Sequence, residues 1–261
     1  MNQTVAPARS GRFAAGFSRA TLRGALGMVL LVALWEGLAR GLALPAYTLP
    51  SVSAILSSIF EHRQSLLAAG AYTFAEALMG YAIGALVGVG LAVVITLVPV
   101  TRNAIVPVAT SINSVPVVAW SPLILLWFGI GMPSKVVMVA LAVSFTVFLS
   151  ALAGLDRVDR RSVDLMRSFG AGRLAILFRL RLPTALPLIA AGLRVSTVRA
   201  IIVAIVTEML GAYDGLGWVI YQAVLQVDFV RVWSAIFVAS AASLAFFGLV
   251  GFAERRLVFW K

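Results

Sequence analysis

Long apolar windows separated by short polar loops constrain this 261-residue chain more than any other feature. Each window approaches the roughly 20 residues that a helix needs to cross about 30 Å of hydrocarbon. Hydrophobic residues are 61% and charged residues only 12% of the composition, which excludes an ordinary soluble domain. We therefore predict an all-α polytopic membrane protein. Its six expected spans lie near residues 25–44, 74–98, 104–128, 134–154, 187–210 and 232–253.

The basic residues indicate how the spans are oriented. Four lie in the segment 1–24, seven in the loop 156–183 and three in the segment 254–261, whereas the alternate loops together hold only four. Lys and Arg accumulate in cytoplasmic loops. We therefore expect residues 1–24 and 254–261 to be cytoplasmic tails around a six-helix domain, 25–253. The net charge of +11 then reflects membrane topology and does not indicate nucleic-acid binding.

The sequence lacks the motifs that an enzyme reading would need. The chain has no cysteine, one histidine (His62) and no phosphate-binding loop of the Gly-x-x-x-x-Gly-Lys-Ser/Thr type. We predict no catalytic residue, no metal site and no cofactor in this chain.

Glycines and prolines predict where the spans pack closely or bend. Gly80, Gly84 and Gly88 are four residues apart, which predicts close helix packing, with a ligand role as the alternative. Three prolines between residues 104 and 128 predict a kinked or interrupted third span. After residues 49–51, an i, i+3, i+4 apolar pattern predicts a short helix at the outer interface, ending near residue 60.

The longest cytoplasmic loop reads as a helix, a glycine break and a second helix. Apolar residues recur at helical spacing in both helices, beginning with Val163 in the first and Ala175 in the second. Residues 170–172 predict a tight helix end, and Pro183 predicts the end of the second helix. A solvated basic loop is the alternative interpretation.

This loop resembles the signature loop of ABC importer permeases. The family pattern is Glu-Ala-Ala, three residues, Gly, nine residues, Ile, one residue and Leu-Pro. The residues at its named positions are Asp164, Gly170, Leu180, Leu182 and Pro183. The sequence departs from the pattern with Asp164 in place of Glu, Leu165-Met166 in place of the two alanines and Leu180 in place of Ile. The resemblance implies that residues 161–170 form a coupling helix seated in an ATPase groove. The implied coupling residues are Asp164, Leu165, Met166, Arg167, Phe169, Gly170, Ala171, Leu182 and Pro183.

Further segments resemble permeases for nitrate, sulfonate, taurine and bicarbonate, over most of the chain. These segments are 49–51, 116–123, 127–131, 192–194, 208–209, 215–217 and 254–256. The resemblance implies a type I importer permease in a bacterial inner membrane, with a second copy of itself as partner. It also implies two ABC ATPase subunits, which bind ATP and Mg²⁺, and a periplasmic or lipid-anchored substrate-binding protein.

Charged residues inside spans are candidates for the translocation pathway because they are costly in hydrocarbon. We expect Arg199 near the membrane midplane, either lowering the barrier for an anionic solute or pairing with a carboxylate such as Glu36. Glu36 could equally form an interhelical hydrogen bond. Glu208 is expected near the outer end of span five, as a helix cap or a contact for the binding protein. Trp120 in the third span is a further pathway candidate.

These observations predict import of a small, anionic solute such as a sulfonate, taurine or nitrate. A neutral heterocyclic precursor transported in the same way is an alternative. An ion-coupled secondary transporter is another, which would usually need intramembrane acids for coupling and often two related halves, and no such repeat is evident in the sequence. A membrane scaffold or intramembrane enzyme would move no solute.

Overall fold

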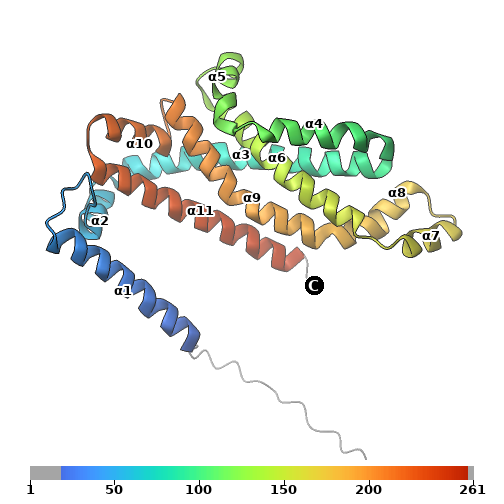
Figure 1. The fold of residues 1–261 in the computed structure, drawn as a ribbon, viewed down its shortest axis with the longest axis horizontal. Helices are drawn as coiled ribbons and strands as arrows, with labels where there is room; N and C mark the ends of the chain where they lie inside the picture. The colour runs from blue at the N-terminus through green and yellow to red at the C-terminus, as the bar shows by residue number, and fades with distance from the viewer. Residues whose placement is uncertain (1–18, 258–261) are drawn as a thin grey trace, which may run out of the picture. The chain divides into compact units, whose positions relative to one another are not determined.

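The computed structural model describes residues 19–257, which are almost entirely helical and contain no β-strand within that range (Figure 1). The chain divides into two units, residues 1–53 and 54–261. The helices are α1 (Arg19–Gly41), α2 (Val52–Glu61), α3 (Arg63–Leu97), η1 (Pro99–Thr101), α4 (Arg102–Ser114), α5 (Val117–Phe128), α6 (Met132–Asp156), α7 (Arg160–Ser168), α8 (Arg173–Ile176), η2 (Leu177–Arg181), α9 (Leu182–Leu210), α10 (Leu216–Leu225) and α11 (Phe229–Leu257).

The number of long apolar helices confirms the predicted fold class. Over residues 19–257, five helical segments are long and apolar enough to cross a membrane, and a bent pair of helices supplies a sixth. The first begins at Arg19, before the predicted boundary at residue 25. Residues 1–18 and 258–261 of the expected tails lie outside the described residues. The predicted short helix is α2.

The third predicted span is interrupted, as its prolines indicated. Helix α4 ends at Ser114, Val115 is extended, and α5 begins after Pro116. The two pieces are bent by 95°. Pro107 and Pro122 lie within α4 and α5 without ending either helix. The break therefore depends on the extended residue before Pro116, since a residue that precedes proline is disfavoured in the α conformation.

The glycine stripe brings α3 against α6. A Cβ atom added at Gly84 would lie 2.7 Å from the carbonyl oxygen of Ala140, and one at Gly88 would lie 2.5 Å from that of Ser144. Both positions therefore admit only glycine at this helix separation. The prediction of close helix packing is confirmed, and it accounts for these glycines without a ligand.

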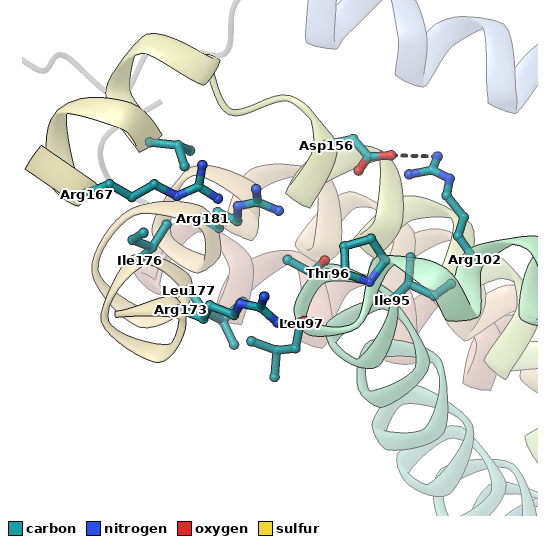
Figure 2. A pocket seen from close by; sticks show the side chains of 12 residues that line it. Ile95, Thr96, Leu97, Arg102, Asp156, Arg167, Arg173, Ile176, Leu177 and Arg181 are labelled. Atoms are coloured by element: carbon teal, nitrogen blue, oxygen red, sulfur yellow. Dashed lines mark hydrogen bonds and ion pairs between the residues drawn. The ribbon is translucent and has the colours of Figure 1, made fainter. Parts of the chain in front are cut away.

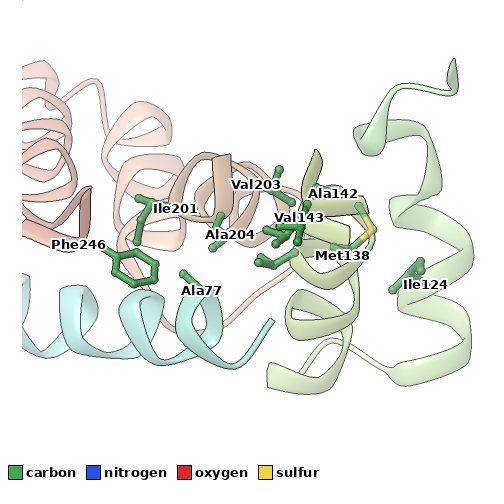
Figure 3. Packing of buried hydrophobic residues seen from close by; sticks show 12 residues of the cluster. Ala77, Ile124, Met138, Ala142, Val143, Ile201, Val203, Ala204 and Phe246 are labelled. Atoms are coloured by element: carbon green, nitrogen blue, oxygen red, sulfur yellow. The ribbon is translucent and has the colours of Figure 1, made fainter. Parts of the chain in front are cut away.

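Helix α6 packs between α3 and α9, and buried residues of five helices meet around it (Figure 3). This core includes Ala77 of α3, Val143 of α6, Ala204 of α9 and Phe246 of α11. Four alanines and four valines make up most of its twelve buried residues, and the alanines let the helices approach closely. Within the unit 54–261, the spans thus pack closely together, and the loops connect their ends.

Two local predictions need correction. Pro183 does not end a helix: η2 is a single π-helical turn that runs directly into α9, and Pro183 lies in the first turn of α9. The hydroxyl of Thr184 donates to the carbonyl of Leu180 at 2.7 Å, which satisfies an acceptor beside the proline. Helix α10 was not predicted. It is mainly apolar, but its ten residues are too few to span a membrane.

Candidate functional site

The cytoplasmic hairpin predicted from the sequence is built on a well-capped short helix. The Asp159 carboxylate accepts from the backbone N–H of Arg161 at 3.3 Å at the start of α7. At its other end, Gly170 has φ +79° and its N–H donates to the Arg167 carbonyl, while Ala171 N–H donates to Met166. These two bonds form a Schellman motif, which requires a left-handed residue at Gly170.

The hairpin presents apolar side chains to its surroundings. Leu165 is 59% and Phe169 83% exposed, and the two are four residues apart on one face of α7. The predicted stripe of Val163, Met166 and Phe169 is only partly right, because Val163 is buried. Helix α7 therefore has an inner face at Val163 and an outer apolar face at Leu165 and Phe169.

The other predicted coupling residues fall into two groups. Asp164 pairs with Arg167 at 3.3 Å on the exposed surface of α7. Leu182 and Pro183 instead begin α9, where Leu182 packs against a core cluster that includes Leu155. The structure thus places the residues from Asp164 to Ala171 together and puts Leu182 and Pro183 in the base of a span.

The pathway candidate Arg199 is held by uncharged partners. Its guanidinium donates to the hydroxyl of Thr146 at 3.1 Å and to the side-chain oxygen of Asn113 at 3.2 Å. The alternative of an Arg199–Glu36 pair is wrong: Glu36 pairs with Arg40 at 2.6 Å and accepts from the Ser53 hydroxyl at 2.7 Å. Glu36 therefore joins α1 to the first turn of α2 by hydrogen bonds.

A cavity of about 220 Å³ lies at the bend between α4 and α5. Asn113 and Trp120 line it together with apolar residues of α3 and α6. Asn113 is also a partner of Arg199. The structure thus brings Trp120 and the Asn113–Arg199 pair to one region, and it places Glu208 elsewhere.

Glu208 is a fully buried helix cap. Its carboxylate accepts from the backbone N–H of Gly217 at 2.7 Å, in the first turn of α10. The hydroxyl of Thr73 accepts from the neighbouring N–H of Leu216 at 2.8 Å. Residues of α9 and α3 therefore hold the start of α10. Of the two expected roles for Glu208, the structure supports helix capping.

Sequence reasoning missed two further buried charges beside this cap, Glu76 and Lys135. Both are at most 1% exposed. The Lys135 ammonium donates to the carbonyls of Ile130 and Gly211, which follow the ends of α5 and α9. A cation is stabilising at helix C-termini because the carbonyls there carry partial negative charge.

The signal for these residues was present in the sequence. Glu76 is an acid within an apolar window, a pattern that marks a partnered side chain. Lys135 was assigned to an outer loop, whereas α6 begins at Met132 and includes it. We define Glu76, Lys135 and Glu208 as the buried charge cluster.

Arg194, the second arginine of span five, pairs with Glu254 of α11 at 3.7 Å and stacks over Phe247 at 4.3 Å. Both contacts tie α9 to α11. A guanidinium over an aromatic face gains from cation–π attraction. This arrangement explains how Arg194 is accommodated in an apolar helix without a transport role.

Comparison with known proteins agrees with this geometry. Residues 80–259 match the family described as the binding-protein-dependent transport system inner membrane component. The formylaminopyrimidine transport permease protein ThiX of Halalkalibacterium halodurans is 30% identical, over 89% of this chain and 93% of ThiX. The taurine transport system permease protein TauC of Escherichia coli is 33% identical, over 72% of this chain and 65% of TauC.

The fold also matches a solved structure. A bacterial ABC transporter involved in the import of the acidic polysaccharide alginate superposes with a TM-score of 0.64, at 16% identity, over 92% of this chain and 97% of the matched chain. At this identity the similarity concerns the fold alone. The fold is that of type I ABC importer transmembrane domains.

Proposed function

This chain belongs to the inner membrane component family of binding-protein-dependent transport systems, as an ABC importer permease subunit, and we propose that α7 is its coupling helix. In this proposal the exposed face of Leu165 and Phe169 fills a groove of a separate ATPase. That ATPase binds ATP and Mg²⁺, and this chain performs no hydrolysis.

One observation carries the proposal: a helix fixed at both ends presents large apolar side chains outward. The Asp159 cap and the Gly170 left-handed turn give α7 defined ends. Phe169 at 83% exposure has no cover within the described chain. An exposed apolar patch on a rigid element is typical of an interaction site.

Cysteine cross-linking tests this coupling role directly, because the chain has no native cysteine. Single cysteines at positions 165 and 169 are expected to cross-link to the cognate ATPase in an assembled, active complex. Phe60→Cys on α2, at an equally exposed phenylalanine, is the control and should not cross-link. Absence of cross-links from every position between 161 and 170 would contradict the proposal.

We further propose that two copies of the chain line the pore, with two ATPases below and a substrate-binding protein outside. ATP-driven closure of the ATPases would move the paired α7 helices together and switch the side to which the pore opens. Both termini are then cytoplasmic, which the basic loop 156–183 supports. Thiol labelling from each side of the membrane tests this: Ser168→Cys should react only from the cytoplasm and Ser65→Cys only from outside.

We propose that the transported solute is a small organic anion, such as a sulfonate. Arg199 supports this, because its charge is held by the neutral Asn113 and Thr146 and is not cancelled by a carboxylate. The similarity to TauC is in accord with it. Arg199→Gln should reduce taurine uptake in proteoliposomes at least tenfold, whereas Arg199→Lys should retain part of it. Wild-type uptake by a normally assembled Arg199→Gln complex would exclude the role.

The second candidate solute is a neutral heterocycle such as a pyrimidine precursor. The cavity beside Trp120 is lined mainly by apolar residues, including Leu91 and Phe145, which suits a flat and weakly polar ring. The relative ThiX is named for formylaminopyrimidine transport. Uptake of labelled formylaminopyrimidine, insensitive to Arg199→Gln and faster than taurine uptake, would favour this solute.

A further inference from the structure

A second cavity, of about 240 Å³, lies at the opposite ends of α3, α6 and α9 from the buried charge cluster (Figure 2). The hairpin closes one side of it, and the loop between α3 and α4 closes the other. We call this cavity the arginine cleft. Its charged lining residues are Arg102, Asp156, Arg167, Arg173 and Arg181.

The arginine cleft carries an excess of positive charge that the described chain does not neutralise. Arg102 pairs with Asp156 at 2.8 Å and Arg167 pairs with Asp164 at 3.3 Å, which leaves Arg173 and Arg181 without a carboxylate among residues 19–257. Arg173 donates to the carbonyl of Leu97 at 3.3 Å, a neutral partner. Arg181 makes no hydrogen bond or ion pair with any residue in the range 19–257. Such a group of guanidinium ions is suited to an anion with several oxygens.

Apart from Thr96, whose hydroxyl donates to the carbonyl of Ala92, the rest of the lining is apolar. Ile95 and Leu97 of α3 face the cleft, as do Val163 of α7 and the buried Ile176 and Leu177. These side chains offer no hydrogen bond to a free inorganic anion. They favour an amphiphile whose charged group meets the arginines while its carbon skeleton contacts the apolar wall.

The position of the cleft on α7 argues against the ATPase as its occupant. Val163 and Arg167 line the cleft, whereas Leu165 and Phe169 do not. The two pairs lie about 200° apart around the helix. A protein bound to the outer face of α7 therefore leaves the cleft uncovered. The cleft instead lies where three apolar helices long enough to span a membrane end, which in the proposed cytoplasmic placement of the hairpin is beside the inner membrane surface.

We propose that the arginine cleft binds the phosphate-bearing headgroup of an anionic phospholipid of the cytoplasmic leaflet. The Arg173 and Arg181 guanidinium groups contact the phosphate, and the Ile95–Leu97 wall contacts the glycerol and upper acyl carbons. The bound lipid then links the hairpin to the end of α3. The proposal rests on the cytoplasmic placement of the hairpin given above.

Arg181 and Arg179 form a matched pair for the test. They are two residues apart in η2, and only Arg181 lines the cleft. The purified full-length chain in neutral detergent is titrated with phosphatidylglycerol or phosphatidylcholine, and bound lipid is counted by native mass spectrometry. We expect tighter binding of phosphatidylglycerol, weakened about tenfold by Arg181→Gln and unchanged by Arg179→Gln, because a charge-assisted hydrogen bond is lost only in the first. Arg181→Lys should retain part of the affinity.

Three results would overturn the proposal. The first is equal phosphatidylglycerol affinity of the Arg181→Gln and Arg179→Gln chains. The second is equal binding of phosphatidylcholine. The third is full displacement by low-millimolar inorganic phosphate, which would identify a site for free phosphate. The assay contains no ATPase, so a failed cross-link from α7 with lipid binding intact would refute the coupling role alone.

Discussion

The two ends of α3, α6 and α9 use charge in opposite ways. At one end, Glu76, Lys135 and Glu208 are buried, and Lys135 and Glu208 bond the backbone at helix ends. At the other end, the arginine cleft and α7 expose their charges, and Arg181 has no partner among residues 19–257. Burial, with hydrogen bonds from Lys135 and Glu208 to the backbone at helix ends, indicates a role in the fold, whereas exposed guanidinium groups without a partner indicate a role in binding.

The comparison makes stability measurements informative, because it predicts large effects at the buried end and small ones at the exposed end. The largest is expected for Lys135→Met. This change removes the donor to the carbonyls of Ile130 and Gly211, at a cost of about 3–5 kcal/mol, because two charge-assisted hydrogen bonds are lost in a buried site. Unfolding in mixed detergent and SDS micelles measures it. The control Arg63→Gln, at an exposed charge, should change stability by less than about 0.5 kcal/mol.

A smaller loss is expected for Glu208→Ala. The N–H of Gly217 then loses its acceptor inside the protein, which costs about 2 kcal/mol. Glu208→Gln keeps a carbonyl oxygen for this bond and should lose less. Amide hydrogen exchange in α10 should rise in the alanine variant only. Full protection of α10 in Glu208→Ala would contradict its role as a cap.

At the exposed end, Gly170→Ala is expected to cost about 1–2 kcal/mol locally, because alanine disfavours a positive φ. The loss should appear as faster proteolysis of the hairpin, with unchanged global unfolding. Gly172→Ala is the matched control: Gly172 has φ −73° and open space around its Cβ position, so no effect is expected. Equal proteolysis of the two variants would rule out a strained turn.

The smallest effect is expected for Asp164→Asn. The Asp164–Arg167 pair is exposed on both sides, and such i, i+3 pairs contribute only about 0.2–0.5 kcal/mol. We expect no measurable change in the unfolding midpoint, at low or high salt. A loss comparable with that of Lys135→Met would remove the distinction between the two ends.

The fold was predictable because its main determinants are local. Span length, the spacing of Gly80, Gly84 and Gly88, and the residues around Pro116 each act within one helix or between two neighbours. The ends of α7 were predictable in part for the same reason: the left-handed turn at Gly170 follows from glycine's lack of a Cβ atom.

The buried charge cluster was not predictable from such local signals. Glu76, Lys135 and Glu208 are far apart in the sequence, and the partners of Lys135 are backbone carbonyls, which leave no trace in side-chain patterns. The partners of Arg199 were missed for a related reason. Asn113 and Thr146 are neutral, whereas a carboxylate is the partner that a buried arginine is expected to have.

The uninterrupted helix from Arg173 to Leu210 has a mechanical consequence. Its 38 residues extend over roughly 57 Å, with the π turn and the interior proline Pro187 as irregular points. One end of this helix belongs to the hairpin. At the other end, the carbonyl of Gly211 accepts a hydrogen bond from Lys135. In the proposed mechanism, a displacement of α7 would reach the region where α10 begins through this one continuous helix. The bending stiffness of the helix then determines what fraction of the displacement is transmitted.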